Sequence, residues 1–264
     1  MHASEKRIIM VPSEKREFEF NPLSSATENT EREKFLSTFR SCPIPENELL
    51  VNLSLFMRRQ VLSRMFFMQE LYLNIINVHG IIVEFGVRWG RNLALFTSFR
   101  GMYEPYNYNR KIVGFDTFSG FPSVSQKDGN FAGIKPDAFS VTPSYEEYLA
   151  QVLDYHEAEC PVNHIKKYEL VKGDVLETLP RYLEQHPETI IALAYFDFDL
   201  YEPTKVCLQL IQKHLTKGSV IGFDELNYAT FPGETLALRE VLGLDRYAIR
   251  HSPHNPLPGY LVIE

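Results

Sequence analysis

The chain has 264 residues, 44% hydrophobic and 23% charged, which is the composition of an ordinary globular protein large enough to bury a core. A formal net charge of -7 argues against a nucleic-acid binder that relies on phosphate neutralisation, although a local Arg or Lys can still hold a small anion. The three cysteines are far apart and form no CxxC pair, which predicts a cytoplasmic protein without disulfides or structural zinc. No apolar run reaches the roughly 18 residues that a membrane span needs, so we expect no membrane anchor.

Residues 1–78 are predicted to form an N-terminal arm and helices ahead of the main domain, residues 79–264. The stretch up to residue 45 is polar and mixed in charge, and we expect a short helix over 31–40. Between residues 46 and 78 apolar side chains recur at helical spacing, which predicts one long amphipathic helix or two that pack on the main domain. The arm and these helices also favour a homodimer or a higher homo-oligomer.

Strands and helices alternate after residue 79. The alternation predicts an α/β, Rossmann-like fold in which a mostly parallel sheet is covered by helices on both faces. The predicted strands span 81–85, 111–116, 168–172, 190–196 and 219–223, followed by two closing strands at 246–250 and 259–263. The predicted helices span 92–99, 174–184, 203–215 and 234–242.

A long insert, residues 118–167, separates the second and third predicted strands. Connections of this type are usually short, so we expect the insert to form a lid or a substrate-binding region. Its aromatic residues Phe131, Phe139, Tyr145 and Tyr148 fit stacking on a sugar and packing within the lid equally well.

Every predicted parallel strand ends in an acid. In open α/β sheets, ligands bind beyond the carboxyl ends of the strands. An acidic rim would repel a nucleotide phosphate, but it suits S-adenosylmethionine (SAM), whose sulfonium, amine, ribose diol and adenine amine can each pair with a carboxylate. The acids are Glu84, Asp116, Asp174, Asp197, and the pair Asp224 and Glu225.

The turn after the first strand also discriminates between cofactors. Gly86 and Gly90 are separated by three residues, and the GxGxxG pattern of a dinucleotide-binding dehydrogenase is absent. Asp116 is placed to accept hydrogen bonds from a ribose diol. Asp174 is placed to accept from an adenine amine, but it also begins an Asp-Val-Leu-Glu capping box, and the two interpretations are compatible.

Four segments in this order resemble the macrocin O-methyltransferase (TylF/MycF) family over residues 81–242. They are 83–87 (VEFGV), 114–122 (GFDTFSGFP), 173–180 (GDVLETLP) and 197–204 (DFDLYEPT). The resemblance implies a class I methyltransferase with a seven-stranded, mostly parallel sheet, an N-terminal helical arm and a lid insert. It also implies SAM-dependent O-methylation of a sugar hydroxyl on a natural product, nucleotide sugar or glycan precursor, often with magnesium (Mg2+).

The same resemblance assigns cofactor-binding roles to individual residues. Glu84, Gly86 and Gly90 match the SAM-binding turn, and Asn92 stands beside the methionine moiety where Ser is common. Asp116 matches the ribose position and Asp174 the adenine position.

The resemblance also implies a metal site. Asp197 matches a metal-binding acid, and Asp224 with Glu225 matches a paired acid site that is usually Asp-Asp. Carboxylates suit Mg2+ rather than zinc, and a cation that binds the acceptor hydroxyl would lower its pKa and orient it. Asp197 or Asp199 could alternatively act as the base, while Asp199 fits a structural contact to the following turn equally well.

Two other functions remain open at this stage. One is a metal-independent N- or C-methyltransferase on the same scaffold, which would ignore chelators. The other is an inactive SAM-binding subunit, against which the complete set of acids argues. The expected partner is a small-molecule acceptor, a sugar or glycoside, with no nucleic acid and no membrane.

Overall fold

The computed structural model describes residues 24–264, and the chain divides into two compact units, Met1–Met57 and Arg58–Glu264. In the first unit, α1 (Ala26–Arg40) starts earlier than the helix predicted over 31–40 because Ser25 and Glu28 form a capping box. Two short elements follow, α2 (Glu46–Leu49) and the 3-10 helix η1 (Leu53–Phe56). The arm predicted for residues 1–23 lies outside the described residues.

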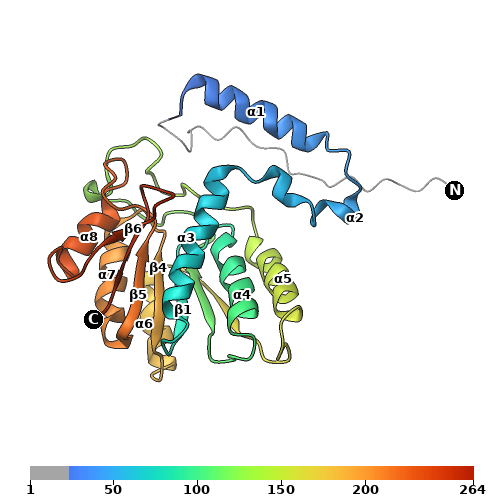
Figure 1. Cartoon of the computed structure of the whole chain (residues 1–264). Helices are drawn as coiled ribbons and strands as arrows, with labels where there is room; N and C mark the ends of the chain where they lie inside the picture. The colour runs from blue at the N-terminus through green and yellow to red at the C-terminus, as the bar shows by residue number, and fades with distance from the viewer. Residues whose placement is uncertain (1–23) are drawn as a thin grey trace. The chain divides into compact units, whose positions relative to one another are not determined.

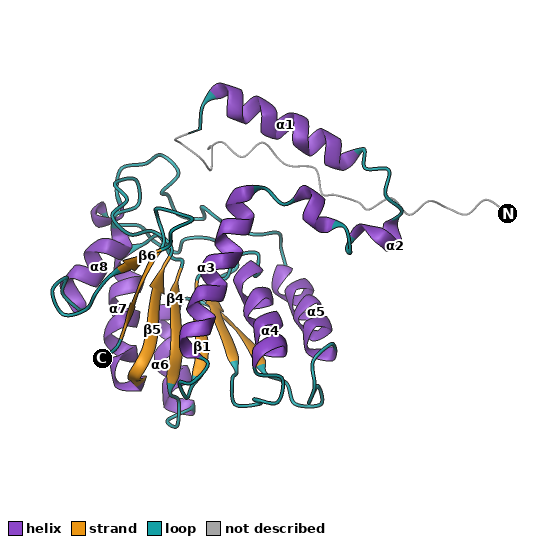
Figure 2. Ribbon diagram, in the orientation of Figure 1, coloured by secondary structure: helices purple, strands orange, loops and turns teal. Residues whose placement is uncertain are grey.

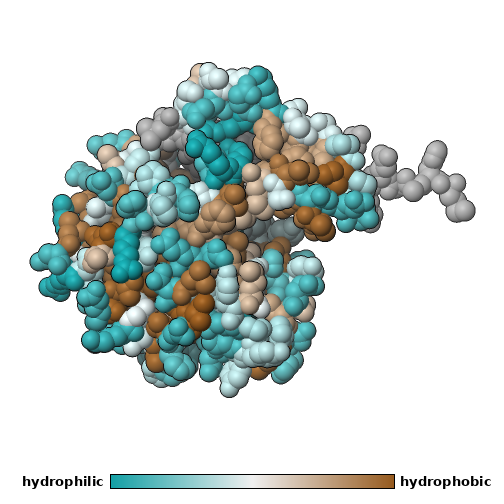
Figure 3. All heavy atoms as spheres, viewed as in Figure 1, coloured by the Kyte–Doolittle hydropathy of each residue, from teal (hydrophilic) through white to brown (hydrophobic). Residues whose placement is uncertain are grey.

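The helix α3 (Arg59–Ile75) opens the second unit. One face of it is fully buried and joins the core of the sheet domain, through Phe67, Met68, Leu71, Tyr72 and Ile75. The second compact unit begins at Arg58, and the amphipathic segment predicted over 46–78 is broken into three pieces. The opposite face keeps apolar side chains exposed, and Figure 3 shows hydrophobic surface along α3; the residues are Leu62, Phe66 and Leu73.

A seven-stranded sheet has the order β3-β2-β1-β4-β5-β7-β6. The strands β1 to β5 pair in parallel, and β7 runs antiparallel to both β5 and β6 (Figure 2). This is the predicted Rossmann-like architecture. The strands are β1 (Ile81–Phe85), β2 (Ile112–Asp116), β3 (Tyr168–Lys172), β4 (Ile191–Phe196), β5 (Leu215–Phe223), β6 (Arg250–His251) and β7 (Gly259–Val262).

Helices cover both faces of the sheet and form two separate hydrophobic cores (Figure 1). Phe67 of α3, Leu93 of α4 and Leu149 of α5 belong to one core. Leu179 of α6 and Leu208 of α7 belong to the other. The remaining helices are α4 (Arg91–Tyr103), α5 (Tyr145–Ala158), α6 (Val175–Gln185), α7 (Tyr201–Ile211), the 3-10 helix η3 (Gln212–His214) and α8 (Gly233–Val241).

Several element boundaries differ from the sequence-based expectation. The helix predicted over 92–99 continues through Gly101 to Tyr103. The helix predicted over 203–215 ends at Ile211, and β5 already begins at Leu215. The closing strand expected at 246–250 is reduced to Arg250–His251. None of the helices in the described part of the chain is long and apolar enough to cross a membrane.

The insert 118–167 is only partly a loop. Its second half contains α5, whose Leu149 and Leu153 are buried in the sheet core beside α4. This helix is part of the layer that covers the sheet, so the predicted lid, if it forms, would comprise residues 118–144 only. Within that stretch the 3-10 helix η2 (Gln126–Asp128) is fixed by Asp128, whose carboxylate accepts from the backbone N–H of Tyr201 at 2.6 Å.

Candidate active site

The turn between β1 and α4 brings the main chain very close to the end of β4. Gly86 has a φ of 91° and Gly90 a φ of 74°, a left-handed conformation that glycine adopts without strain. A Cβ atom on Gly86 would lie 2.0 Å from the carbonyl oxygen of Asp197. The glycine is therefore required for the close approach of two strand ends, whatever ligand the turn binds.

Asp116, at the end of β2, ties this turn to the start of the insert. Its carboxylate accepts from the backbone N–H of Arg88 at 2.7 Å and from that of Phe118 at 2.5 Å. Burial raises the pKa of Asp116, while these backbone donors oppose the rise. Each carboxylate oxygen keeps a second lone pair, so the structural role leaves room for a contact with a ribose hydroxyl.

Glu84 is a buried carboxylate with one unused oxygen. Its Oε1 accepts from Asn92 Nδ2 at 2.7 Å, whereas Oε2 has no hydrogen-bond partner among residues 24–264. Burial, with repulsion from Asp197, raises the pKa of Glu84 well above its ordinary value. A buried acceptor without a donor is costly, so this oxygen fits a donor group of a bound ligand such as the amine of SAM.

Asp174 caps the next helix. It is the N-cap of α6 and accepts from the backbone N–H of Leu176 at 2.9 Å. Asp174 is thus confirmed as a helix cap, but the reciprocal bond from Glu177 that would complete the predicted capping box is not recorded. The contact of Asp174 with an adenine amine stays a prediction.

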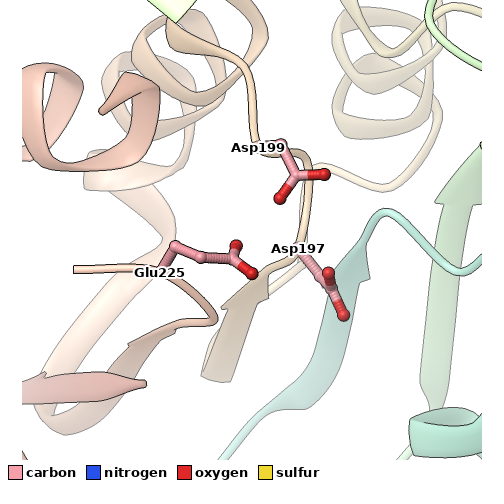
Figure 4. A group of neighbouring side chains, drawn as sticks. All are labelled: Asp197, Asp199 and Glu225. Carbon is pink, nitrogen blue, oxygen red and sulfur yellow. The ribbon is translucent and has the colours of Figure 1, made fainter. Parts of the chain in front are cut away.

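Three carboxylates gather beyond the ends of β4 and β5. Oxygens of Asp197, Asp199 and Glu225 all lie within 4.8 Å of one another (Figure 4). Burial together with repulsion from Asp224 raises the pKa of Asp197 to about 7, and burial raises that of Asp199 to about 6. The Oε2 atom of Glu225 is buried and has no hydrogen-bond partner within the part of the chain that the structure describes. This donor set fits a hard cation such as Mg2+.

Asp224 does not belong to this group, although the sequence predicted a metal site of Asp197, Asp224 and Glu225. Its Oδ1 is 2.6 Å from Arg64 Nη1 and accepts from the hydroxyl of Tyr195 at 2.5 Å. Burial opposes ionisation of Asp224, but the attraction of Arg64 and then Arg91 outweighs it and lowers the pKa. Asp199, expected as a base or as a turn contact, takes the third place instead.

Arg64 is a site residue that the sequence analysis missed. Its Nη2 donates to Asp197 Oδ2 at 2.6 Å, and its Nε donates to Asn92 Oδ1 at 3.2 Å. It lies on α3, four residues before Met68 and seven before Leu71, and so on the buried face of the helix. A charged residue on an apolar helix face indicates a buried partner, and that signal was present in the sequence.

Glu234 was also missed. It is fully buried at the start of α8, and its carboxylate accepts from the backbone N–H of Phe198 at 3.1 Å and of Glu225 at 3.2 Å. Burial and repulsion from Asp199 raise the pKa of Glu234 well above its ordinary value. One side chain therefore holds together the two loops that carry the acid group.

The aromatic residues of the insert have packing partners. The rings of Phe131 and Phe139 lie 5.8 and 6.3 Å from that of Phe231, between centroids. Tyr145 packs edge-on against Trp89 at 4.7 Å and donates its hydroxyl to the Trp89 carbonyl. Packing accounts for these residues, and stacking on an acceptor stays a prediction.

Comparison with solved structures places the chain beside known methyltransferases. It is similar to CalS11, a calicheamicin methyltransferase, with 47% identical residues and a TM-score of 0.88. The match covers 90% of this chain and 93% of that chain. An apo structure of CalS11, described as a TDP-rhamnose 3'-O-methyltransferase of calicheamicin biosynthesis, gives 44% identity, coverages of 90% and 95%, and a TM-score of 0.79. The O-methyltransferase NovP shares the fold, with 18% identity, coverages of 76% and 79%, and a TM-score of 0.58. No protein-family model and no curated protein matches the chain.

Proposed function

The chain belongs to the TylF/MycF-like group of sugar O-methyltransferases and is a SAM-dependent O-methyltransferase, and we propose that it methylates a hydroxyl of a nucleotide-linked deoxysugar in natural-product biosynthesis. Its relative CalS11 acts on TDP-rhamnose, which makes a TDP-linked sugar the first acceptor to test. The observation that carries the proposal is the partly buried acid group of Asp197, Asp199 and Glu225, which adjoins the turn that matches the SAM-binding motif.

Methyl transfer from a sulfonium requires an aligned acceptor oxygen and a group that takes its proton. Without a bound cation, Asp197 suits the second task, because burial raises its pKa to about 7, near the pH at which a general base works best. Arg64 orients the Asp197 carboxylate through Oδ2. Asp199 lies beside it as an alternative base, with a pKa raised to about 6.

A divalent cation, with Mg2+ as the preferred ion, would be held by Asp197, Asp199 and Glu225, with Asp224 next to them. The unpartnered Oε2 of Glu225 and the mutual repulsion of these carboxylates support such a site. When bound, the ion would lower the pKa of the acceptor hydroxyl and orient it. This separates the proposal from a metal-independent N- or C-methyltransferase.

The test combines purified protein, SAM and TDP-rhamnose, and follows the methylated sugar by mass spectrometry. We expect O-methylated product with Mg2+, little product after chelation, and recovery on adding Mg2+ back. Asp197→Asn should lose turnover while it still binds SAM, whereas Glu169→Gln, on β3 away from the acid group, should keep it. Full turnover by stripped protein would contradict the metal site. Failure to methylate a panel of nucleotide sugars in the presence of Mg2+ would contradict the acceptor class.

The proposal also includes the cellular compartment and the oligomeric state. We expect the enzyme to act in the cytoplasm and to form a homodimer or a higher homo-oligomer. Analytical ultracentrifugation of the full chain measures the assembly, and a single species with the mass of one chain would contradict it.

A further inference from the structure

The guanidinium of Arg64 occupies the space between the ends of β4 and β5. Its Nη2 lies 2.6 Å from Asp197 Oδ2 and its Nη1 lies 2.6 Å from Asp224 Oδ1, so it joins one carboxylate from each strand end. Only 14% of the Arg64 side chain is exposed, and the guanidinium lies 5.9 Å from the centre of the Tyr195 ring. The residue therefore takes the position that a cation shared by Asp197 and Asp224 would need.

The charges around Arg64 do not balance. Asp197, Asp199, Asp224 and Glu225 lie at this place, and Arg64 forms short ion pairs with Asp197 and Asp224. The side chain of Arg91, 3.8 Å from Asp197, is 62% exposed, and the charge of Arg88 acts on Asp199. Four carboxyl groups therefore outnumber the three arginines around them, and a divalent ion would supply further positive charge. A guanidinium and a divalent ion on the same carboxylate would repel each other strongly in a buried site.

We propose that Arg64 is an exchangeable counter-cation, which holds Asp197 and Asp224 in the metal-free enzyme and releases Asp197 when the divalent ion binds. The inference rests on the metal site of the proposed function and adds the residue that competes with the ion. Arg64 thereby sets the metal affinity.

The test measures binding of Mn2+, in place of Mg2+, by electron paramagnetic resonance of the free ion, with the full-length protein and no acceptor. Arg64→Gln should bind Mn2+ at least tenfold more tightly than the wild type, because the competing charge is gone. Arg64→Lys, which keeps the charge, should stay within about threefold of the wild type. The matched control is Arg91→Gln, an exposed arginine near the same carboxylate, which should also change the affinity by less than about threefold. Circular dichroism verifies that each variant folds.

The outcomes distinguish a failure of the Arg64 exchange from a failure of the metal site itself. If the wild type binds Mn2+ and Arg64→Gln binds it equally or more weakly, Arg64 is a fixed part of the site and the exchange is refuted. If neither the wild type nor any variant binds Mn2+, the metal site itself is refuted and the exchange with it.

A second measurement does not depend on the folding of any variant. In crystals of the wild type soaked with Mn2+, anomalous scattering locates the ion. We expect the Arg64 guanidinium to lie beyond hydrogen-bonding distance of Asp197. A structure with the ion bound and the Arg64–Asp197 contact intact would overturn the proposal.

Discussion

At the scale of single residues, several carboxylates serve the fold and are also placed for a ligand. Asp116 holds two backbone N–H groups, and Asp174 caps α6. One carboxylate oxygen of Glu84 accepts a hydrogen bond from Asn92, and the other has no hydrogen-bond partner in the described part of the chain. Because carboxylate oxygens accept more than one hydrogen bond, a structural contact does not remove a residue from the binding site. For variants of these residues, both the affinity for SAM and the stability of the protein must therefore be measured.

Asp116→Ala should weaken SAM binding by roughly 1–3 kcal/mol, the usual cost of losing one charged hydrogen-bond partner. It should also lower the melting temperature, because two backbone donors lose their acceptor. Calorimetry with SAM and thermal unfolding measure the two effects. Glu188→Ala, an exposed acid outside the site, is the control. A dissociation constant equal to that of the wild type would show that Asp116 does not contact the cofactor.

Gly86→Ala should destabilise the protein and abolish SAM binding. The positive φ alone costs about 1–3 kcal/mol for a residue with a Cβ, and that Cβ would meet the Asp197 carbonyl at 2.0 Å. Urea unfolding measures the loss. Gly243→Ala shares the left-handed φ but would meet only a side-chain oxygen of Asp245 at 3.0 Å, so it should cost less. Equal losses for the two variants would mean that the close approach at Gly86 is unimportant.

At the scale of elements, the layers of helices decide which parts of the chain can move. The helix α5 packs against α4 and contributes Leu149 and Leu153 to a core, so it cannot open without exposing apolar surface. Residues 118–144 contain no such helix, and η2 is held by Asp128 at the backbone of Tyr201. The insert thus consists of a loop with one short helical turn, η2, followed by the helix α5, which packs in the layer that covers the sheet.

Hydrogen exchange should divide the insert at this boundary. We expect residues 118–144 to exchange rapidly in the free enzyme and more slowly once SAM and an acceptor are bound, because a closing loop excludes water. The helix α5, Tyr145–Ala158, should be protected in both states. Mass spectrometry of proteolytic peptides measures both segments in one experiment. Equal exchange of 118–144 with and without ligands would reject the lid.

At the scale of the whole molecule, the acid group of Asp197, Asp199 and Glu225 should make the stability of the protein depend on pH. Burial raises the pKa of Asp197 to about 7 and that of Asp199 to about 6, above the ordinary value of 3.8. Between about pH 4 and pH 7 these two carboxyl groups therefore bind more protons in the folded protein than in the unfolded chain. Linkage then requires that the free energy of unfolding falls as the pH rises through this interval. The lowered pKa of Asp224 acts only below about pH 3.8, outside it.

The metal-free protein should accordingly be less stable at pH 8 than at pH 5.5. Urea unfolding with a chelator measures this difference, and added Mg2+ should reduce it at pH 8 because the ion stabilises the ionised carboxylates. Asp197→Asn should show a smaller pH dependence, since it cannot ionise. Stability that rises from pH 5.5 to pH 8 in the chelated protein would contradict the raised pKa values.

Much of the architecture could be predicted because it depends on local patterns. The segments 81–85 and 168–172 became β1 and β3 with unchanged bounds. The central strand β1 is almost entirely apolar, as a buried parallel strand requires, whereas β3 lies at the edge of the sheet and also carries Glu169 and Lys172. The fold class and the acids at the strand ends followed from the same alternation. The chain also carried its family resemblance in four short segments, and the similarity to CalS11 confirmed it.

Only the tertiary structure decided which charges meet. Arg64 lies on a helix that the sequence analysis placed before the main domain, 133 residues away from Asp197, and Glu234 reaches two loops from the start of α8. Side-chain partners so far apart in the chain depend on helix rotation and on strand order, which periodicity does not specify. For that reason the sequence indicated a metal site with Asp224, whereas the folded chain pairs Asp224 with Arg64 and brings Asp199 to Asp197 and Glu225.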